Sequence, residues 1–151
     1  MLNQGERSVR QEPANRSRPL GRALVVEDDA LIAMDIAEAL ADAGAAPVII
    51  CATIAAAMGE LERGVPALLV LDVHLTDRDD GWALAELAHQ LGDAPPLVLF
   101  TTATPEMIPP SAATLGHMLP KPFRTEDLVS LVRRQTSSGL LARIRNVFSN
   151  S

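Results

Sequence analysis

Short runs of aliphatic residues alternate along this chain with longer segments in which apolar residues recur at helical spacing. The short runs are typical of strands buried on both faces of a sheet, and the longer segments are typical of amphipathic helices. The expected strands cover residues 23–26, 47–51, 67–71, 97–100 and 117–119. The expected helices cover residues 30–43, 54–63 and 82–91, with a last helix capped by Thr125. Strands that alternate with helices form a parallel sheet with right-handed connections, so the pattern predicts an α/β fold.

The ends of the first two expected helices carry recognisable signals. Gly44 follows the first helix, in the position where glycine commonly terminates a helix. Thr53 precedes the second helix as a candidate N-cap, and Gly64 closes it. Between the fourth and fifth strands, however, lie Pro105, Pro109 and Pro110. Because proline removes a backbone donor and clashes with the preceding turn, we expect a degenerate fourth helix there.

Both ends of the chain depart from the alternating pattern. Residues 1–21 contain glycine, prolines and scattered arginines without periodicity, which predicts a disordered tail. Residues 22–135 form the expected domain, and residues 136–151 form a C-terminal extension. Apolar residues of the extension recur at helical spacing, which favours a separate short amphipathic helix, with disorder as the alternative. These apolar residues are Leu140, Leu141, Ile144, Val147 and Phe148.

The net charge of −6 is distributed unevenly along the chain. Residues 1–22 carry a net charge of +3 and residues 133–151 a net charge of +4, which leaves −13 on the stretch between them. An acidic body of this kind argues against nucleic acid as a direct partner and favours a bound cation. The longest nearly apolar run is too short to span a bilayer, and the N-terminus lacks the apolar core of a secretory signal. We therefore expect a cytoplasmic protein without membrane contact.

Acidic residues follow two of the expected strands at the point where each strand ends. Glu27 and Asp28 come directly after the first strand, and Asp72 follows the third. In open parallel sheets, ligands bind beyond the carboxyl ends of the strands. Three carboxylates that meet there repel one another unless a cation offsets their charge. Mg²⁺ prefers such oxygen ligands, so the pattern predicts a Mg²⁺ site at which one carboxylate attacks phosphorus.

Positive charge and hydroxyl groups follow the other two expected strands at the same edge. Lys121 comes after the fifth strand, and Thr101 and Thr102 end the fourth. Transfer of a phosphoryl group requires positive charge and hydrogen-bond donors around its equatorial oxygens, which Lys121 and either threonine can supply. His74 lies two positions after Asp72, and we expect a metal there to contact its backbone carbonyl rather than its ring.

Four short motifs, in this order, resemble the signatures of response-regulator receiver domains. They are V-V-E-D-D at 25–29, L-V-L-D-V at 69–73, F-T-T-A at 100–103 and K-P-F at 121–123. The spacing of 44 positions from Asp28 to Asp72, and of 30 from Asp72 to Thr102, is also similar to that of the family. The resemblance covers about residues 22–135.

The resemblance implies a flavodoxin-like, doubly wound sheet of five parallel strands in the order 2-1-3-4-5. It implies that Asp72 accepts a phosphoryl group, that Thr102 is the switch hydroxyl, and that Lys121 binds the phosphate before a cis-proline, Pro122. The implied Mg²⁺ ligands are Glu27, Asp28, Asp72 and the backbone carbonyl of His74. At one position the chain departs from the family, because Met118 stands where an aromatic residue is usual.

The implied function is a two-component switch that receives its phosphoryl group from a sensor histidine kinase or a histidine phosphotransfer protein. The 16 residues after position 135 are too few for an output domain. The protein is therefore expected to act as a relay, a phosphate sink or an adaptor for a downstream protein partner. Only self-phosphorylation and self-dephosphorylation are expected of it, so it is not expected to be an enzyme.

Two other classes of function fit part of this pattern. A haloacid-dehalogenase-like phosphatase also uses an aspartyl-phosphate, Mg²⁺ and a lysine. Its nucleophile follows the first strand in a D-x-D pattern, which Glu27, Asp28 and Asp29 do not form. A pseudo-receiver, which acts only as an interaction module, is expected to have lost the acidic residues that this chain retains.

Overall fold

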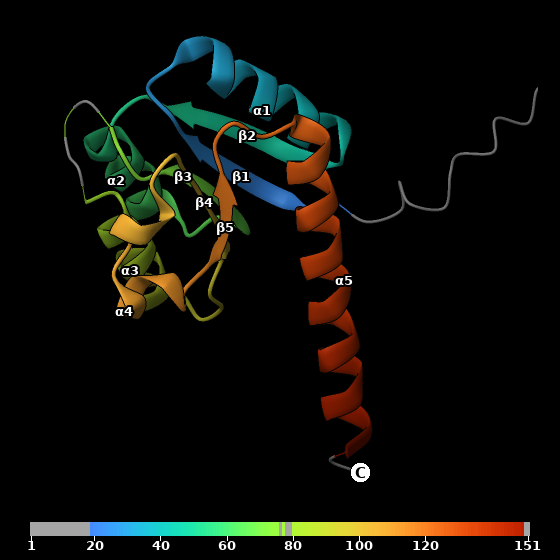
Figure 1. Cartoon of the computed structure of the whole chain (residues 1–151). Helices are drawn as coiled ribbons and strands as arrows, with labels where there is room; N and C mark the ends of the chain where they lie inside the picture. Colours follow the sequence, from blue (N-terminus) through green and yellow to red (C-terminus); the bar gives the residue numbers. More distant parts are fainter. Residues whose placement is uncertain (1–18, 76, 78–79, 150–151) are drawn as a thin grey trace, which may run out of the picture.

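Five parallel strands form a single sheet in the computed structural model, which describes residues 19–75, 77 and 80–149, with side chains as far as residue 138 (Figure 1). The strands are β1 (Gly21–Val26), β2 (Ala45–Cys51), β3 (Leu68–Asp72), β4 (Leu97–Thr102) and β5 (His117–Pro120). They lie in the order β2-β1-β3-β4-β5, so the predicted strand order is confirmed. This order makes β1 and β3 neighbours, with Val26 opposite Leu71 in the register.

Helices cover both faces of the sheet. They are α1 (Ala30–Asp42), α2 (Ile54–Arg63), α3 (Trp82–Leu91), α4 (Pro110–Ala113) and α5 (Thr125–Ser149), with a 3-10 turn η2 (Pro105–Met107). Helices α1 and α5 contact each other on one face, and α2, α3 and α4 pack on the other (Figure 1). The predicted doubly wound α/β fold is therefore confirmed. Among the described helices, none combines the length and apolar character needed to cross a membrane.

Strand β1 divides the hydrophobic core into two layers, because its side chains point alternately to the two faces of the sheet. Leu24 and Val26 belong to the layer beneath α2, α3 and α4, whereas Ala23 and Val25 belong to the layer beneath α1 and α5. All four side chains are fully buried. Each fully buried valine or leucine contributes about 1.5–3 kcal/mol, so the packing on both faces fixes where the strand ends lie.

The strands β1, β2, β4 and β5 are slightly longer than the sequence indicated, and β3 keeps its expected length but lies one residue later. β3 and β4 extend through Asp72 and Thr102, because Asp72 pairs with Thr101 and continues the ladder. β1 begins at Gly21, and the backbone N–H of Leu20 donates to the carbonyl of Gly44, so the predicted disordered tail extends too far at this end. The prediction for residues 1–18 falls outside the described residues. Arg22 holds this start of the strand through an ion pair of 2.9 Å with Glu60 of α2.

The predicted ends of α2 are confirmed, whereas the predicted cap of α5 is wrong. Thr53 accepts a hydrogen bond from the backbone N–H of Ala56, and Gly64 terminates the helix. Thr125, in contrast, is the first residue of α5, and the carbonyl of Arg124 accepts its first backbone hydrogen bonds. The proline-rich segment contains only η2 and the four residues of α4, as the predicted degenerate fourth helix requires.

Helix α5 continues through the boundary that we expected at residue 135. It runs without interruption from Thr125 to Ser149, so the extension is helical as predicted as far as Ser149, but it continues α5 and does not form a separate short helix. No proline lies between these residues, and the single Gly139 costs about 1 kcal/mol relative to alanine, which a helix of this length tolerates. The predicted apolar face of the extension lies outside the described side chains.

Candidate functional site

Three carboxylates meet at the carboxyl edge of the sheet, where β1 and β3 lie side by side. Glu27 directly follows β1 and Asp72 ends β3; both are buried, and Asp28 is exposed. One oxygen atom from each of the three side chains lies within 4.8 Å of the others. The register accounts for this arrangement, because the paired residues Val26 and Leu71 are followed directly by Glu27 and Asp72.

Lys121, directly after β5, contacts two of these carboxylates. Its Nζ donates to Asp72 Oδ2 at 3.0 Å and to Glu27 Oε1 at 3.2 Å. Its backbone N–H donates to the carbonyl of Thr102 at 2.8 Å, and the Lys121–Pro122 peptide bond is cis. Burial opposes the charge of the lysine, but Asp72 and Glu27 outweigh this effect and raise the pKa of Lys121. The ammonium group is therefore charged and held beside Asp72.

Glu27 has the most perturbed carboxyl group of the site. Burial first, and the neighbouring Asp72 second, raise the pKa of Glu27 from 4.5 to about 8, although Lys121 acts in the opposite direction. Its Oε2 atom is buried and has no hydrogen-bond partner among the described residues. A buried oxygen without a partner is costly, and a cation bound by the three carboxylates would satisfy it. The residues present therefore fit a small cation that prefers oxygen ligands, such as Mg²⁺.

The metal-free protein is expected to lose stability as the pH rises from about 5 to about 8. The pKa of Glu27 is higher in the folded protein, about 8, than its ordinary 4.5, so the folded state retains a proton that the unfolded chain has released. This contribution is complete below pH 4.5 and disappears as the pH passes 8. The neutral amide of Glu27→Gln removes the titration, so the variant should melt several degrees above wild type at pH 8. Thermal unfolding in a chelator measures this difference, and parallel losses in both proteins would contradict it.

Thr101 and Thr102 at the end of β4 are both buried, and the hydroxyl of Thr102 is turned toward its own loop. Thr102 Oγ1 accepts the backbone N–H of Thr104 at 3.0 Å and lies 3.5 Å from Thr104 Oγ1. The ring of His74, in the loop after β3, reaches the same place: His74 Nε2 and Thr104 Oγ1 share a hydrogen bond of 2.6 Å. The sequence favoured the backbone carbonyl of His74 over its ring, with an effect of the ring on phosphoryl lifetime as the minor alternative. It did not indicate this side-chain contact, which joins residues 30 positions apart.

The loop after Asp72 is held at several points. The backbone N–H of His74 donates to Asp72 Oδ1 at 3.1 Å. Asp77 accepts the N–H of Ile54 at 3.1 Å, which ties the loop to the start of α2. At Gly81 a Cβ atom would lie 2.9 Å from the carbonyl oxygen of Asp72, so only glycine allows the loop to return this closely. The sequence did not indicate these anchors, since their partners are distant in the chain.

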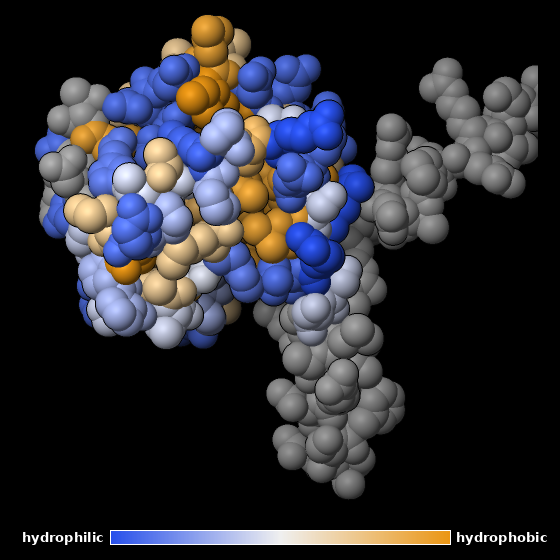
Figure 2. Space-filling view, viewed as in Figure 1, coloured by the Kyte–Doolittle hydropathy of each residue, from blue (hydrophilic) through white to orange (hydrophobic). Residues whose placement is uncertain are grey.

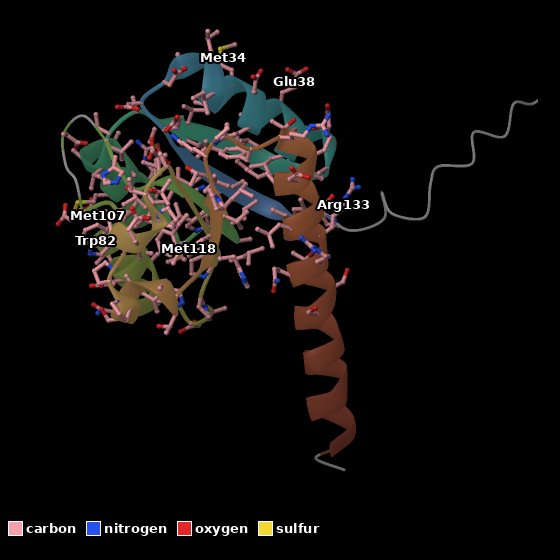
Figure 3. The ribbon with its side chains drawn as sticks, viewed as in Figure 1. Met34, Glu38, Trp82, Met107, Met118 and Arg133 are labelled. Carbon is pink, nitrogen blue, oxygen red and sulfur yellow. The ribbon has the colours of Figure 1, made fainter. Side chains whose placement is uncertain are left out.

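A hollow of about 370 Å³ lies beside Lys121, between α1 and the start of α5. Ile32 and Ile36 line it from α1, and Phe123 lines it from the opposite side. On the outer surface of α1, Leu31 is 76% exposed and Met34 is 61% exposed. Figure 2 shows apolar surface at this end of α1, and Figure 3 shows Met34 on its outer side. An apolar surface therefore lies next to the acidic site.

Met118 occupies the position in β5 where the family resemblance implies an aromatic side chain. It is 37% exposed, and Figure 3 labels it on the strand at the edge of the sheet. An unbranched thioether fills space in several rotamers, so it constrains its neighbours less strictly than a rigid ring does.

The doubly wound sheet, with three carboxylates, a lysine and a buried threonine at its carboxyl edge, defines a receiver-type signalling domain. Residues 23–133 match the family described as the response regulator receiver domain, and the chain belongs to this family of two-component signalling proteins.

Individual relatives agree with this assignment. The transcriptional regulatory protein PdtaR of Mycobacterium tuberculosis is 32% identical over 118 residues, which are 77% of this chain and 57% of PdtaR. The structure of the response regulator PhyR from Brucella abortus is similar with a TM-score of 0.67 and 26% identity, over 87% of this chain and 56% of that one. A CheY-like receiver domain from Methylobacillus flagellatus shares the fold with a TM-score of 0.66 and 20% identity, over 76% of this chain and 97% of that one. The chain thus spans little more than half the length of PdtaR.

Proposed function

We propose that this chain is a phosphorylation switch in which Asp72 accepts a phosphoryl group from a sensor histidine kinase or a histidine phosphotransfer protein. The observation that carries the proposal is the contact of Lys121 Nζ with both Asp72 Oδ2, at 3.0 Å, and Glu27 Oε1, at 3.2 Å. This contact fixes a positive charge beside a carboxylate at the edge where such sheets bind their ligands. It supports a site for an incoming phosphoryl group.

In the proposed step, a carboxylate oxygen of Asp72 attacks the phosphorus of a phosphohistidine. A P–O bond forms while the P–N bond breaks, and its electron pair leaves with the imidazole nitrogen of the donor. Lys121 balances the charge of the phosphoryl oxygens, and the hydroxyl of Thr102 donates to one of them once it has left Thr104. The backbone N–H of His74, which already donates to Asp72, lies close enough to serve as a further donor.

Mg²⁺ is the proposed cofactor. It would be held by Glu27, Asp28, Asp72 and the backbone carbonyl of His74. When bound, it neutralises negative charge that develops on the phosphoryl oxygens. The part played by Glu27 follows from its burial: a protonated carboxyl is stable there without metal, and an ionised one is stable only beside a cation.

The proposed output is altered binding of a downstream protein, so that the chain acts as a relay, a phosphate sink or an adaptor in the cytoplasm. The acidic body supports protein rather than nucleic acid as the partner, and no membrane contact is proposed. The hollow beside Lys121, together with exposed Leu31 and Met34, offers apolar surface on which a protein phosphodonor can bind next to Asp72. No catalytic turnover is proposed for the chain itself.

The quantity that separates this proposal from its alternatives is the number of phosphoryl groups handled per chain. With Mg²⁺ and acetyl phosphate, intact mass spectrometry should detect one added phosphoryl group, and a generic phosphomonoester should not be turned over. Multiple turnover of the monoester would instead indicate a phosphatase of the haloacid-dehalogenase kind. Absence of any adduct, with the protein folded and Mg²⁺ present, would indicate a pseudo-receiver.

A further inference from the structure

We propose that His74 and Thr104 form a latch that holds the hydroxyl of Thr102 in its unphosphorylated position. Both are positioning residues, since they act through Thr102 and not on the phosphoryl group. The inference rests on the proposed function and adds to it a contact that sets how readily the site switches.

The first half of the latch is the position of the Thr102 hydroxyl. Its hydrogen-bonding contacts among the described residues are both with Thr104: the backbone N–H at 3.0 Å and Oγ1 at 3.5 Å. Thr102 is fully buried, so water does not compete for these contacts. For the hydroxyl to turn to a phosphoryl group on Asp72, Thr104 has to release it.

The second half of the latch is the hydrogen bond between His74, in the loop after β3, and Thr104, in the loop after β4. His74 Nε2 lies 2.6 Å from Thr104 Oγ1, and the N–H of the same histidine donates to Asp72 Oδ1 at 3.1 Å. One residue therefore joins the proposed phosphoacceptor to the loop that holds the threonine. Thr104 cannot move away from the site without losing its bond to His74.

The residues at the two ends of this hydrogen bond, His74 and Thr104, lie in different surroundings. The His74 end belongs to the loop anchored by Asp77 on α2 and by the close approach of Gly81 to the carbonyl of Asp72. The Thr104 end begins a segment that contains only η2 and the four residues of α4. The contacts to the hydroxyl of Thr102 come from the Thr104 end, so the latch opens when Thr104 moves away from His74.

The latch is formed in the unphosphorylated state and broken in the switched state, so it lowers the population of the switched state. Loss of the latch should tighten the binding of any ligand that selects the switched state. The expected factor is about three- to tenfold, which corresponds to the net contribution of one ordinary hydrogen bond.

The test is the affinity of the full chain for beryllofluoride, a phosphoryl mimic, in the presence of Mg²⁺. Fluorescence of Trp82, the single tryptophan, follows binding, and backbone amide NMR shifts report the position of residues 101–108. The latch is removed in His74→Ala and in Thr104→Val, and retained in His74→Gln and Thr104→Ser, which keep a hydrogen-bonding group in place. Because this is an equilibrium measurement, it is independent of how fast an aspartyl-phosphate hydrolyses.

The two variants without the latch should bind the mimic about three to ten times more tightly than wild type. Thr104→Ser should behave like wild type, and His74→Gln should bind less tightly than His74→Ala. The double variant His74→Ala, Thr104→Val should be no tighter than either single variant, because both remove the same bond. Unchanged or weaker binding in both single variants would overturn the latch. If wild type and all variants fail to bind beryllofluoride, the proposed function itself is rejected, and the latch with it.

Discussion

Replacement of Asp72 by asparagine is expected to abolish phosphoryl incorporation from acetyl phosphate. An amide preserves the shape of the side chain but is a poor nucleophile, so the loss should be complete rather than partial. Lys121 retains Glu27 as a partner in the variant, and the buried position of residue 72 at the end of β3 is unchanged. Intact mass spectrometry of wild type and Asp72→Asn, each with Mg²⁺ and acetyl phosphate, measures the difference directly.

Asp77→Asn provides a matched control for this experiment. Asp77 lies in the same loop, but its carboxylate accepts the N–H of Ile54, outside the acidic site. Asparagine retains an acceptor for that contact, so Asp77→Asn should fold and become labelled like wild type. A label that persists in Asp72→Asn, or disappears in Asp77→Asn, would assign the phosphoryl group to a different residue.

Removal of the Asp28 carboxylate is expected to weaken Mg²⁺ binding by at least about tenfold. Loss of a residue that merely supports a metal ligand already costs about 10–100-fold in affinity, and the loss of a ligand should cost no less. Mg²⁺ is small and dehydrates reluctantly, so the remaining Glu27 and Asp72 offer too few fixed oxygens. Asp28 is exposed, so Asp28→Ala should fold.

Calorimetric titration of Asp28→Ala with Mg²⁺ measures this loss, and Asp35→Ala is the control. Asp35 is an exposed acidic residue of α1 that lines the neighbouring hollow but lies outside the cluster of three carboxylates. Its removal changes the net charge by the same amount, so it should leave the affinity close to that of wild type. Equal losses in both variants would mean that Asp28 acts through general charge and not as a ligand.

The arrangement of the acidic site was predictable because it depends on strand order and on little else. A strand buried on both faces is a continuous apolar run, as in β3, where all five residues are buried. Once such runs are placed side by side, the residues at their ends have to meet. Glu27 and Asp72 are brought together in this way, and Lys121 reaches both from the position directly after β5.

Contacts made by loops were not predictable in the same way. The pairing of His74 with Thr104 and that of Asp77 with Ile54 join positions 30 and 23 residues apart, and tertiary packing decides them. Asp29 is different, because an aspartate just before a helix is a capping signal that the sequence did contain. It caps α1 by accepting the N–H groups of Leu31 and Ile32.

Because α5 is one continuous helix, its far end lies well away from the domain that holds its base. Its 25 residues correspond to a rod about 37 Å long, at about 1.5 Å per residue. The family match ends at residue 133, so about two thirds of that rod extends past the matched region, and Figure 1 shows it projecting beyond the sheet. The base of α5 is held by its contacts with α1 and β4. A tilt of about 5° at that base displaces the far end by about 2 Å over the projecting length. A tilt of α5 that is too small to alter the packing of the domain would therefore still displace the end of the helix that lies far from Asp72.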